Sequence, residues 1–203
     1  SYVTSILQRD VRDMARIEGL ADMPRLLALL ASRSSSLLNY SDLSRSLGMP
    51  TSTLKRYMAL LEATFLVHLL PAWSTNLGLR LAKAPKLLLN DTGLLIDQIG
   101  LDEDRLKADA LIGGHVLENF VAMELQKQRG WSTTCPGIFH FRTTTGAEVD
   151  IVLESRRGEV VGIEVKASAS VKSDDFRGLR GLAAMAGERF LRGIVLYTGP
   201  ESL

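Results

Sequence analysis

Two acidic residues and a lysine stand at a spacing that could support metal-dependent hydrolysis. Asp150 lies in a short run of alternating residues, and Glu164 and Lys166 lie in a second run after a polar turn at residues 155–158. Two such runs around a glycine-containing turn predict a β-hairpin. Side chains alternate between the faces of a strand, so these three are expected to project from one sheet surface. The same alternation predicts four buried neighbours: Val149, Ile151, Ile163 and Val165. Two carboxylates and one ammonium group placed together could hold a hard divalent metal ion and position a water molecule.

A helix predicted at about residues 115–129 adds a third acidic residue. Glu118 lies at the edge of the apolar stripe of this helix, where a carboxylate can reach over a sheet and stay partly solvated. The other elements of this half are strands at about 139–142, 148–153, 160–166 and 193–197 and a helix at about 174–186. The order helix, strand, strand, strand, helix, strand predicts a mixed sheet flanked by helices, in the α+β or α/β class.

The first half of the chain is predicted to be helical and to contain a helix-turn-helix. Helices are expected over residues 2–18, from Pro24 to the serine cluster at 32–36, over 41–47, and onwards from a cap at Thr51 or Ser52. Gly48 suits the left-handed turn between the last two helices. Helix, glycine turn, helix is the helix-turn-helix arrangement. Short runs at 65–70 and 86–89 around a basic loop are interpreted as the strands of a wing, so this region is expected to be a winged helix.

Four residues of the second half resemble the PD-(D/E)XK nuclease superfamily. A helix glutamate, an aspartate on the second strand and a Glu-x-Lys pair on the third strand match Glu118, Asp150, Glu164 and Lys166 in order and setting. Val149 stands where the name of the motif has a proline. The resemblance implies a restriction-endonuclease-like mixed sheet flanked by helices, and a phosphodiester as substrate.

Motifs along nearly the whole chain resemble the C-terminal region of a prokaryotic family of AAA-type ATPases, in which an ATPase domain precedes a domain of unknown function. These motifs lie at residues 9–13, 38–43, 54–57, 90–94, 117–121 and 146–150. The resemblance implies three segments: 1–36 as the end of the ATPase domain or a linker, 37–98 as the winged helix-turn-helix, and 99–203 as the nuclease-like domain. The phosphate-loop pattern Gly-x-x-x-x-Gly-Lys-Ser/Thr is missing from the sequence, so ATP is expected only in the upstream domain. The opening Ser1 fits a fragment of a longer protein, with methionine removal or tag cleavage as the alternative.

The superfamily resemblance assigns a role to each residue of the group. Asp150 and Glu164, with the main-chain carbonyl of Val165, would hold Mg²⁺ or Mn²⁺ through oxygen atoms. Lys166 would orient the water or stabilise the transition state, and Glu118 would complete the outer shell or bind a second ion. The alternative is a solvated charged face, because charged residues are mostly exposed and restriction-endonuclease-like folds also serve as inert binding platforms.

Basic residues predict contacts to nucleic acid. The second helix of the helix-turn-helix would present four residues to a major groove: Ser52, Thr53, Lys55 and Arg56. Phosphate contacts are expected from Arg45, Arg80, Lys83 and Lys86, and in the second half from Arg142, Arg177 and Arg180. The alternative is a protein-docking module that joins the ATPase domain to the C-terminal domain, with these basic residues merely solvated.

Composition narrows the class of protein. The 203 residues include 24 Lys and Arg against 23 Asp and Glu, a net charge of +1, so nucleic-acid affinity must come from a local basic face. The single Cys135 excludes an intrachain disulfide and fits a reducing compartment, and no apolar run is long enough to cross a bilayer. The chain is therefore expected to be cytoplasmic and away from membranes, and any oligomer is expected to form through the ATPase domain.

Two functions fit these patterns. The first is a DNA-associated module in which a winged helix and a metal-dependent nuclease-like domain are driven by the upstream ATPase. The second is a catalytically inert interaction or regulatory region that recognises nucleic acid or a protein partner for the ATPase.

Overall fold

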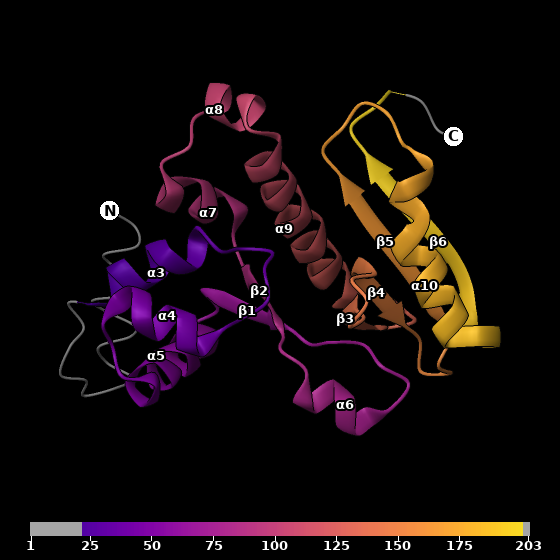
Figure 1. Ribbon diagram of the computed structural model, residues 1–203, viewed down its shortest axis with the longest axis horizontal. Coiled ribbons are helices and arrows are strands. Elements are labelled where there is room, and N and C mark those ends of the chain that lie inside the picture. The colour runs from indigo at the N-terminus through magenta and orange to yellow at the C-terminus, as the bar shows by residue number, and fades with distance from the viewer. Residues whose placement is uncertain (1–21, 201–203) are drawn as a thin grey trace.

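The hydrophobic patterns organise the chain into two neighbouring halves, each with its own sheet and helices (Figure 1). The computed structural model describes residues 22–200; the helix predicted over 2–18 and the motif at 9–13 lie outside the described residues. The first half contains α3 (Met23–Ala31), α4 (Tyr40–Leu47), α5 (Thr51–Ala63), β1 (Val67–Leu70), α6 (Leu77–Ala82), β2 (Lys86–Leu89) and α7 (Thr92–Ile99). The second half contains α8 (Glu103–Ala108), α9 (Ala110–Arg129), β3 (Gly137–Arg142), β4 (Glu148–Glu154), β5 (Val160–Lys166), α10 (Arg177–Ala186) and β6 (Phe190–Tyr197).

The helix pair α4 and α5 forms as predicted, with one difference at the start of α5. Gly48 follows α4 with a φ of 65°, a left-handed conformation that favours glycine. Pro50 takes the N-cap position of α5 without a side-chain hydrogen bond. The prediction that Thr51 or Ser52 caps this helix is wrong, because both residues already belong to its first turn.

The two short runs interpreted as wing strands do pair with each other. β1 and β2 are antiparallel, with Leu70 opposite Lys86, and all four residues of β2 are buried. Residues 71–85 connect them and include the helix α6, where the sequence predicted only a loop. We call residues 71–85 the arm.

The arm and β2 join the first half to the second half. The backbone N–H of Trp73 donates to the carbonyl of His140 on β3 at 2.6 Å, and the N–H of His140 donates to Pro71 at 2.9 Å. The side chain of Asn119 on α9 is fully buried and binds both backbone groups of Leu89 on β2, at 2.9 and 3.0 Å. The side-chain amide thereby takes the place of a neighbouring strand, which fixes α9 against β2.

The second half is a four-stranded mixed sheet between two helices, as the element order predicted. The strand order is β3-β4-β5-β6, with antiparallel neighbours except for the parallel pair β5 and β6. On one face α9 packs against Ile138, Ile151 and Ile163, and on the other face α10 packs against Val152 and its neighbours. In Figure 1, α9 runs between the helices of the first half and the sheet.

The hydrophobic cores cross the boundary that the sequence suggested at residue 99. The core of the first half extends to Val116 on α9, and Leu70 and Leu88 of the first half pack into the core under α9. Trp73 of the arm packs into the core under α10. The three predicted segments therefore remain an interpretation of the sequence. Within residues 22–200, no helix has the length and apolar character that crossing a membrane requires.

Candidate functional site

A β-bulge in β4 directs Asp150 toward α9. Phe139 pairs with Val152 and Phe141 with Val149, so a single β3 residue, His140, stands opposite two β4 residues. Such a bulge bends a strand and re-aims a side chain. Val149 and Ile151 are both fully buried, as predicted. They lie in different cores, however, because the bulge interrupts the simple alternation that the sequence prediction assumed.

The backbone pairing of β4 with β5 ends next to Asp150, and the side chain of Asp150 continues the contact between the two strands. The last pair of the ladder is Ile151 with Ile163. Beyond it, Oδ2 of Asp150 accepts the backbone N–H of Val165 at 3.0 Å, in place of a backbone carbonyl. A side-chain carboxylate therefore lies in the gap between the two strands, where residues from both faces of the sheet can reach it.

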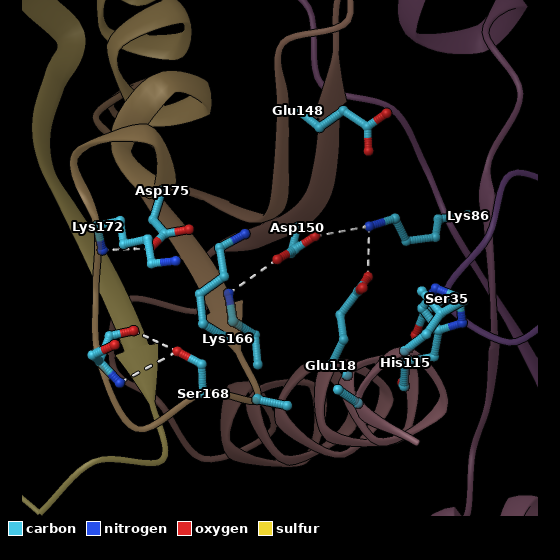
Figure 2. A pocket seen from close by; sticks show the side chains of 16 residues that line it. Ser35, Lys86, His115, Glu118, Glu148, Asp150, Lys166, Ser168, Lys172 and Asp175 are labelled. Atoms are coloured by element: carbon cyan, nitrogen blue, oxygen red, sulfur yellow. Dashed lines mark hydrogen bonds and ion pairs between the residues drawn. The ribbon is translucent and has the colours of Figure 1, made fainter. Parts of the chain in front are cut away.

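Glu118 reaches this gap from α9 and meets a lysine of the first half there. Nζ of Lys86 lies 2.5 Å from Oε1 of Glu118 and 3.4 Å from Oδ1 of Asp150 (Figure 2). Lys86 is 6% exposed and Glu118 is 8% exposed, so water screens the contact little. Burial alone would lower the pKa of Lys86, but the carboxylates of Glu118 and Asp150 outweigh it and raise this pKa. The ammonium group is therefore charged.

Glu164 and Lys166 approach the gap from β5. Nζ of Lys166 lies 3.0 Å from Oε2 of Glu164, which is 5% exposed. The start of α10 comes very close to this carboxylate: a Cβ atom at Gly178 would lie 2.5 Å from Oε1 of Glu164 and 1.6 Å from the carbonyl oxygen of Glu148. Glycine at this position thus permits α10 to pack beside the site.

The cluster holds three carboxyl groups against two ammonium groups. Burial raises the pKa of Glu118 to about 8, against the opposing pull of Lys86, and Asp150 adds to the rise. Burial also raises the pKa of Glu164 to about 7, and the negative charge of Asp150 adds to it. Closely spaced acids titrate together. The excess of acids is therefore expected to keep a proton within the cluster near neutral pH.

A pocket of about 510 Å³ opens over this cluster, and Figure 2 shows its lining. Glu118, Asp150 and Lys166 line it together with Lys86 and Val165. Ser168, Lys172 and His115 lie around its rim. The fold thus gathers the four predicted catalytic residues, three at the pocket wall and Glu164 bound to Lys166.

The carboxylate oxygens of the cluster suit a hard cation, but the ammonium group of Lys86 already contacts two of them, one of Glu118 and one of Asp150. Among the residues that the structure describes, no group of three or more His, Cys, Asp and Glu side chains is arranged to bind a metal ion. Lys166 engages Glu164, and Lys86 lies between Glu118 and Asp150. Asp150 and Glu164 supply oxygen atoms of the kind that Mg²⁺ prefers, but the ammonium group of Lys86 lies beside Asp150, so a metal ion bound there would have to displace it.

The residues predicted to contact nucleic acid differ in how free their side chains are. Ser52, Lys55 and Arg56 on α5 and Arg177 on α10 are exposed, and Thr53 is half-buried. Arg45 and Arg180 are also exposed, but Arg45 lies 3.5 Å from Asp42 and Arg180 donates to the carbonyl of Ser173 at 2.6 Å. The other four bind within the protein: Arg80 to Glu154, Lys83 to the carbonyl of Arg142, the exposed Arg142 to Glu148, and Lys86 to Glu118. A phosphate could reach Arg80 or Lys86 only after these pairs open.

Sequence reasoning assigned Lys86 to a phosphate contact and missed it as a member of the site. The signal available was weak. Lys86 opens an apolar strand that is otherwise leucine, where a buried lysine requires an acidic partner. A second signal was the charge balance of the predicted group, because its three acids and one amine leave acids that need a further cation nearby.

Comparisons with known proteins describe the chain without assigning an activity. The model of a family described as domain of unknown function (DUF8612) matches residues 1–105, and that of domain of unknown function (DUF4143) matches residues 113–203. Uncharacterized proteins of Mycobacterium bovis and Mycobacterium tuberculosis are each 29% identical over 204 residues. The match covers 98% of this chain but 43% of each relative, so the chain spans less than half of their length. No solved structure matches the chain.

Proposed function

We propose that this chain, which belongs to the DUF8612 family of domains of unknown function, carries a metal-dependent phosphodiester-hydrolysing site of the PD-(D/E)XK type in its second half. The observation that carries the proposal is the convergence of Glu118, Asp150 and Lys166 at one pocket, with Glu164 bound to Lys166. The element order and the mixed sheet agree with it, and so does the carboxylate in the gap between β4 and β5.

The residues divide the chemistry among themselves. Asp150 and Glu164, with the carbonyl oxygen of Val165, would hold Mg²⁺ or Mn²⁺. When bound, the ion would make a water molecule more acidic and neutralise charge on the phosphate. Lys166 would hold the attacking water or the negative charge that develops on the phosphate oxygens. Glu118 would bind the outer waters of the ion, and the N–H of Val165 keeps Asp150 in position.

The exposed residues of α4 and α5 supply the nucleic-acid part of the proposal. Arg45, Lys55 and Arg56 lie exposed on one helix pair, which suits a winged helix that contacts DNA in a cytoplasmic protein. The remaining part of the longer relatives would hold the ATPase domain that binds ATP, drives this region and forms any oligomer. The DUF4143 match to residues 113–203 fits a separate nuclease-like segment of such a protein.

A second function is favoured by a separate observation, the two ammonium groups that hold all three acids. In this alternative the second half is an inert platform, and the cluster merely fastens the first half to it. Nucleic acid or a protein partner would bind without being cleaved. The experiment below separates the two.

The test is cleavage of supercoiled plasmid, single-stranded DNA and RNA by the 203-residue chain at saturating Mn²⁺ or Mg²⁺, with EDTA as the blank. Cleavage should require the metal and fall at least about 100-fold in Lys166→Ala, since electrostatic groups at a transition state contribute that much. Asp150→Asn should abolish it.

Glu124→Gln is the matched control, because Glu124 lies on α9 like Glu118 but pairs with Lys127 at the surface. It should cleave at the wild-type rate. Equal cleavage by wild type and by the Asp150→Asn, Lys166→Ala double variant would identify a contaminant. No cleavage by wild type at saturating metal would reject hydrolysis and leave the inert platform.

A further inference from the structure

Lys86 reaches the site from the other half of the molecule. It is the first residue of β2, and its side chain crosses to Glu118 on α9 and Asp150 on β4 (Figure 2). Each partner belongs to the group that the proposed hydrolysis requires. Lys86 therefore links the first half directly to two residues of the proposed site in the second half.

The backbone of Lys86 is held firmly in the first half. It pairs with Leu70 on β1 and forms a bridge with Leu37. At the other end of β2, Asn119 binds both backbone groups of Leu89. The backbone from which the Lys86 side chain reaches the site is therefore fixed against α9, the helix that carries Glu118.

The ammonium group and a metal ion would compete for Asp150, the carboxylate that would hold the ion together with Glu164. Nζ of Lys86 lies 3.4 Å from Oδ1 of Asp150, so an ion bound to Asp150 would lie close to the ammonium charge. Two positive charges this close repel each other strongly where little water screens them.

We propose that Lys86 is a built-in cation that closes the site, so that a divalent metal binds fully only when the Lys86 side chain leaves Glu118 and Asp150. This inference rests on the proposed function.

The test is Mn²⁺ binding, measured by calorimetry and by the electron paramagnetic resonance signal of free Mn²⁺, in wild type and in Lys86→Met. Methionine keeps the length of the side chain and removes the charge. Lys86→Met should bind Mn²⁺ about 10- to 100-fold more tightly, the usual size of coupling between two competing sites. Lys127→Met is the matched control, because Lys127 also lies close to a glutamate, at 2.6 Å, but at the surface.

A second measurement uses wild type alone, in case Lys86→Met does not fold. An amine-reactive label read by mass spectrometry should modify Lys86 slowly without metal and at least several-fold faster with Mn²⁺. In Asp150→Asn the metal should make no difference. Lys172, exposed at the rim of the pocket, serves as the internal reference.

The outcomes separate this inference from the proposed function. Equal Mn²⁺ affinity in wild type and Lys86→Met, or labelling of Lys86 that ignores Mn²⁺, overturns the inference and leaves the metal site standing. Failure of both proteins to bind Mn²⁺ overturns the metal site and the inference together. Tighter binding by Lys86→Met, or Mn²⁺-dependent labelling of Lys86, supports both.

Discussion

Arg80 in the arm and Lys86 at the start of β2 each place a cation on carboxylates of the second half, but they bind these carboxylates in different ways. Arg80 binds Glu154 with both terminal nitrogens, at 2.5 and 2.8 Å, and its Nε donates to the carbonyl of Ser74. The guanidinium also lies over the rings of Trp73 and Phe139. Each of its three nitrogens has a partner, and the hydrogen bonds from Arg80 lower the pKa of Glu154.

Lys86 instead faces more acid than it can neutralise. It contacts Glu118 and Asp150 through one nitrogen, and the pKa of Glu118 is raised by burial to about 8 even with Lys86 beside it. A bidentate pair with stacked rings is a fixed anchor. A single ammonium group among surplus carboxylates can be exchanged for another cation or for a proton. The Arg80–Glu154 pair is therefore a structural contact, whereas the contact of Lys86 with Glu118 can be replaced.

The largest expected effect is on the anchor. Arg80→Met would leave Glu154 without its cation in a mostly buried position, and should lower the free energy of unfolding by about 3–5 kcal/mol. Urea denaturation at pH 7 measures this. Lys127→Met removes an exposed partner and should change stability by less than about 1 kcal/mol. A loss for Arg80→Met no greater than for Lys127→Met would refute the anchor.

His140, which lies between the two ends of the arm, should make stability depend on pH. Burial and the nearby charge of Lys86 lower the pKa of His140 to about 4, while its value in the unfolded chain is near 6.5. The unfolded chain therefore gains a proton first as the pH falls, and the contribution of His140 is lost between about pH 6.5 and 4. Between pH 7 and pH 5 this amounts to about 2 kcal/mol.

The contribution of His140 is isolated by comparing urea midpoints of wild type and His140→Gln at both pH values. Glutamine can still donate to the carbonyl of Ala84, which the His140 ring contacts at 3.1 Å, but it does not titrate. The variant should lose about 2 kcal/mol less than wild type on going to pH 5. Parallel losses in the two proteins would contradict the assignment.

Removing Lys86 should cost less than removing Arg80. Glu118 can take up a proton in Lys86→Met, so the variant loses about one hydrogen bond, roughly 1–2 kcal/mol at pH 7. Adding Glu118→Gln should restore part of the loss, because the excess of carboxyl groups over ammonium groups then returns from two to one, as in wild type. The same urea series measures both. If Lys86→Met is as destabilised as Arg80→Met, the contrast between the two cations fails.

The smallest effect concerns the cations that face solvent. Lys55 is exposed on α5, 5.6 Å from the centre of the Tyr40 ring. If α5 contacts DNA, Lys55→Met should lower the slope of log affinity against log salt by about 1, as expected for one lost phosphate contact. Fluorescence anisotropy with duplex DNA at several salt concentrations measures the slope. An unchanged slope would remove Lys55 from the interface.

Local patterns in the sequence predicted much of the second half. Val160–Lys166 forms the strand expected there, because strand alternation is a local property. Glu118 lies on the packed side of α9, but the prediction that it stays partly solvated is wrong: it is 8% exposed and pairs there with Lys86. The bulge at Asp150 was not predictable in this way, since it depends on the register with β3. The position of Lys86 depends on how β2 packs on α9, a contact between residues 32 positions apart. Tertiary contacts of this kind leave little trace in local periodicity.

The amide of Asn119 has a consequence for how the molecule comes apart. By replacing a strand neighbour for Leu89, it makes β2 and α9 neighbours in one hydrogen-bonded unit, and Ser34 Oγ adds a further bond at 2.8 Å. Separating β2 from α9 would break these buried hydrogen bonds together, and such coupling favours a single cooperative unfolding transition. The two segments recognised as separate families should therefore melt in one cooperative transition rather than one after the other.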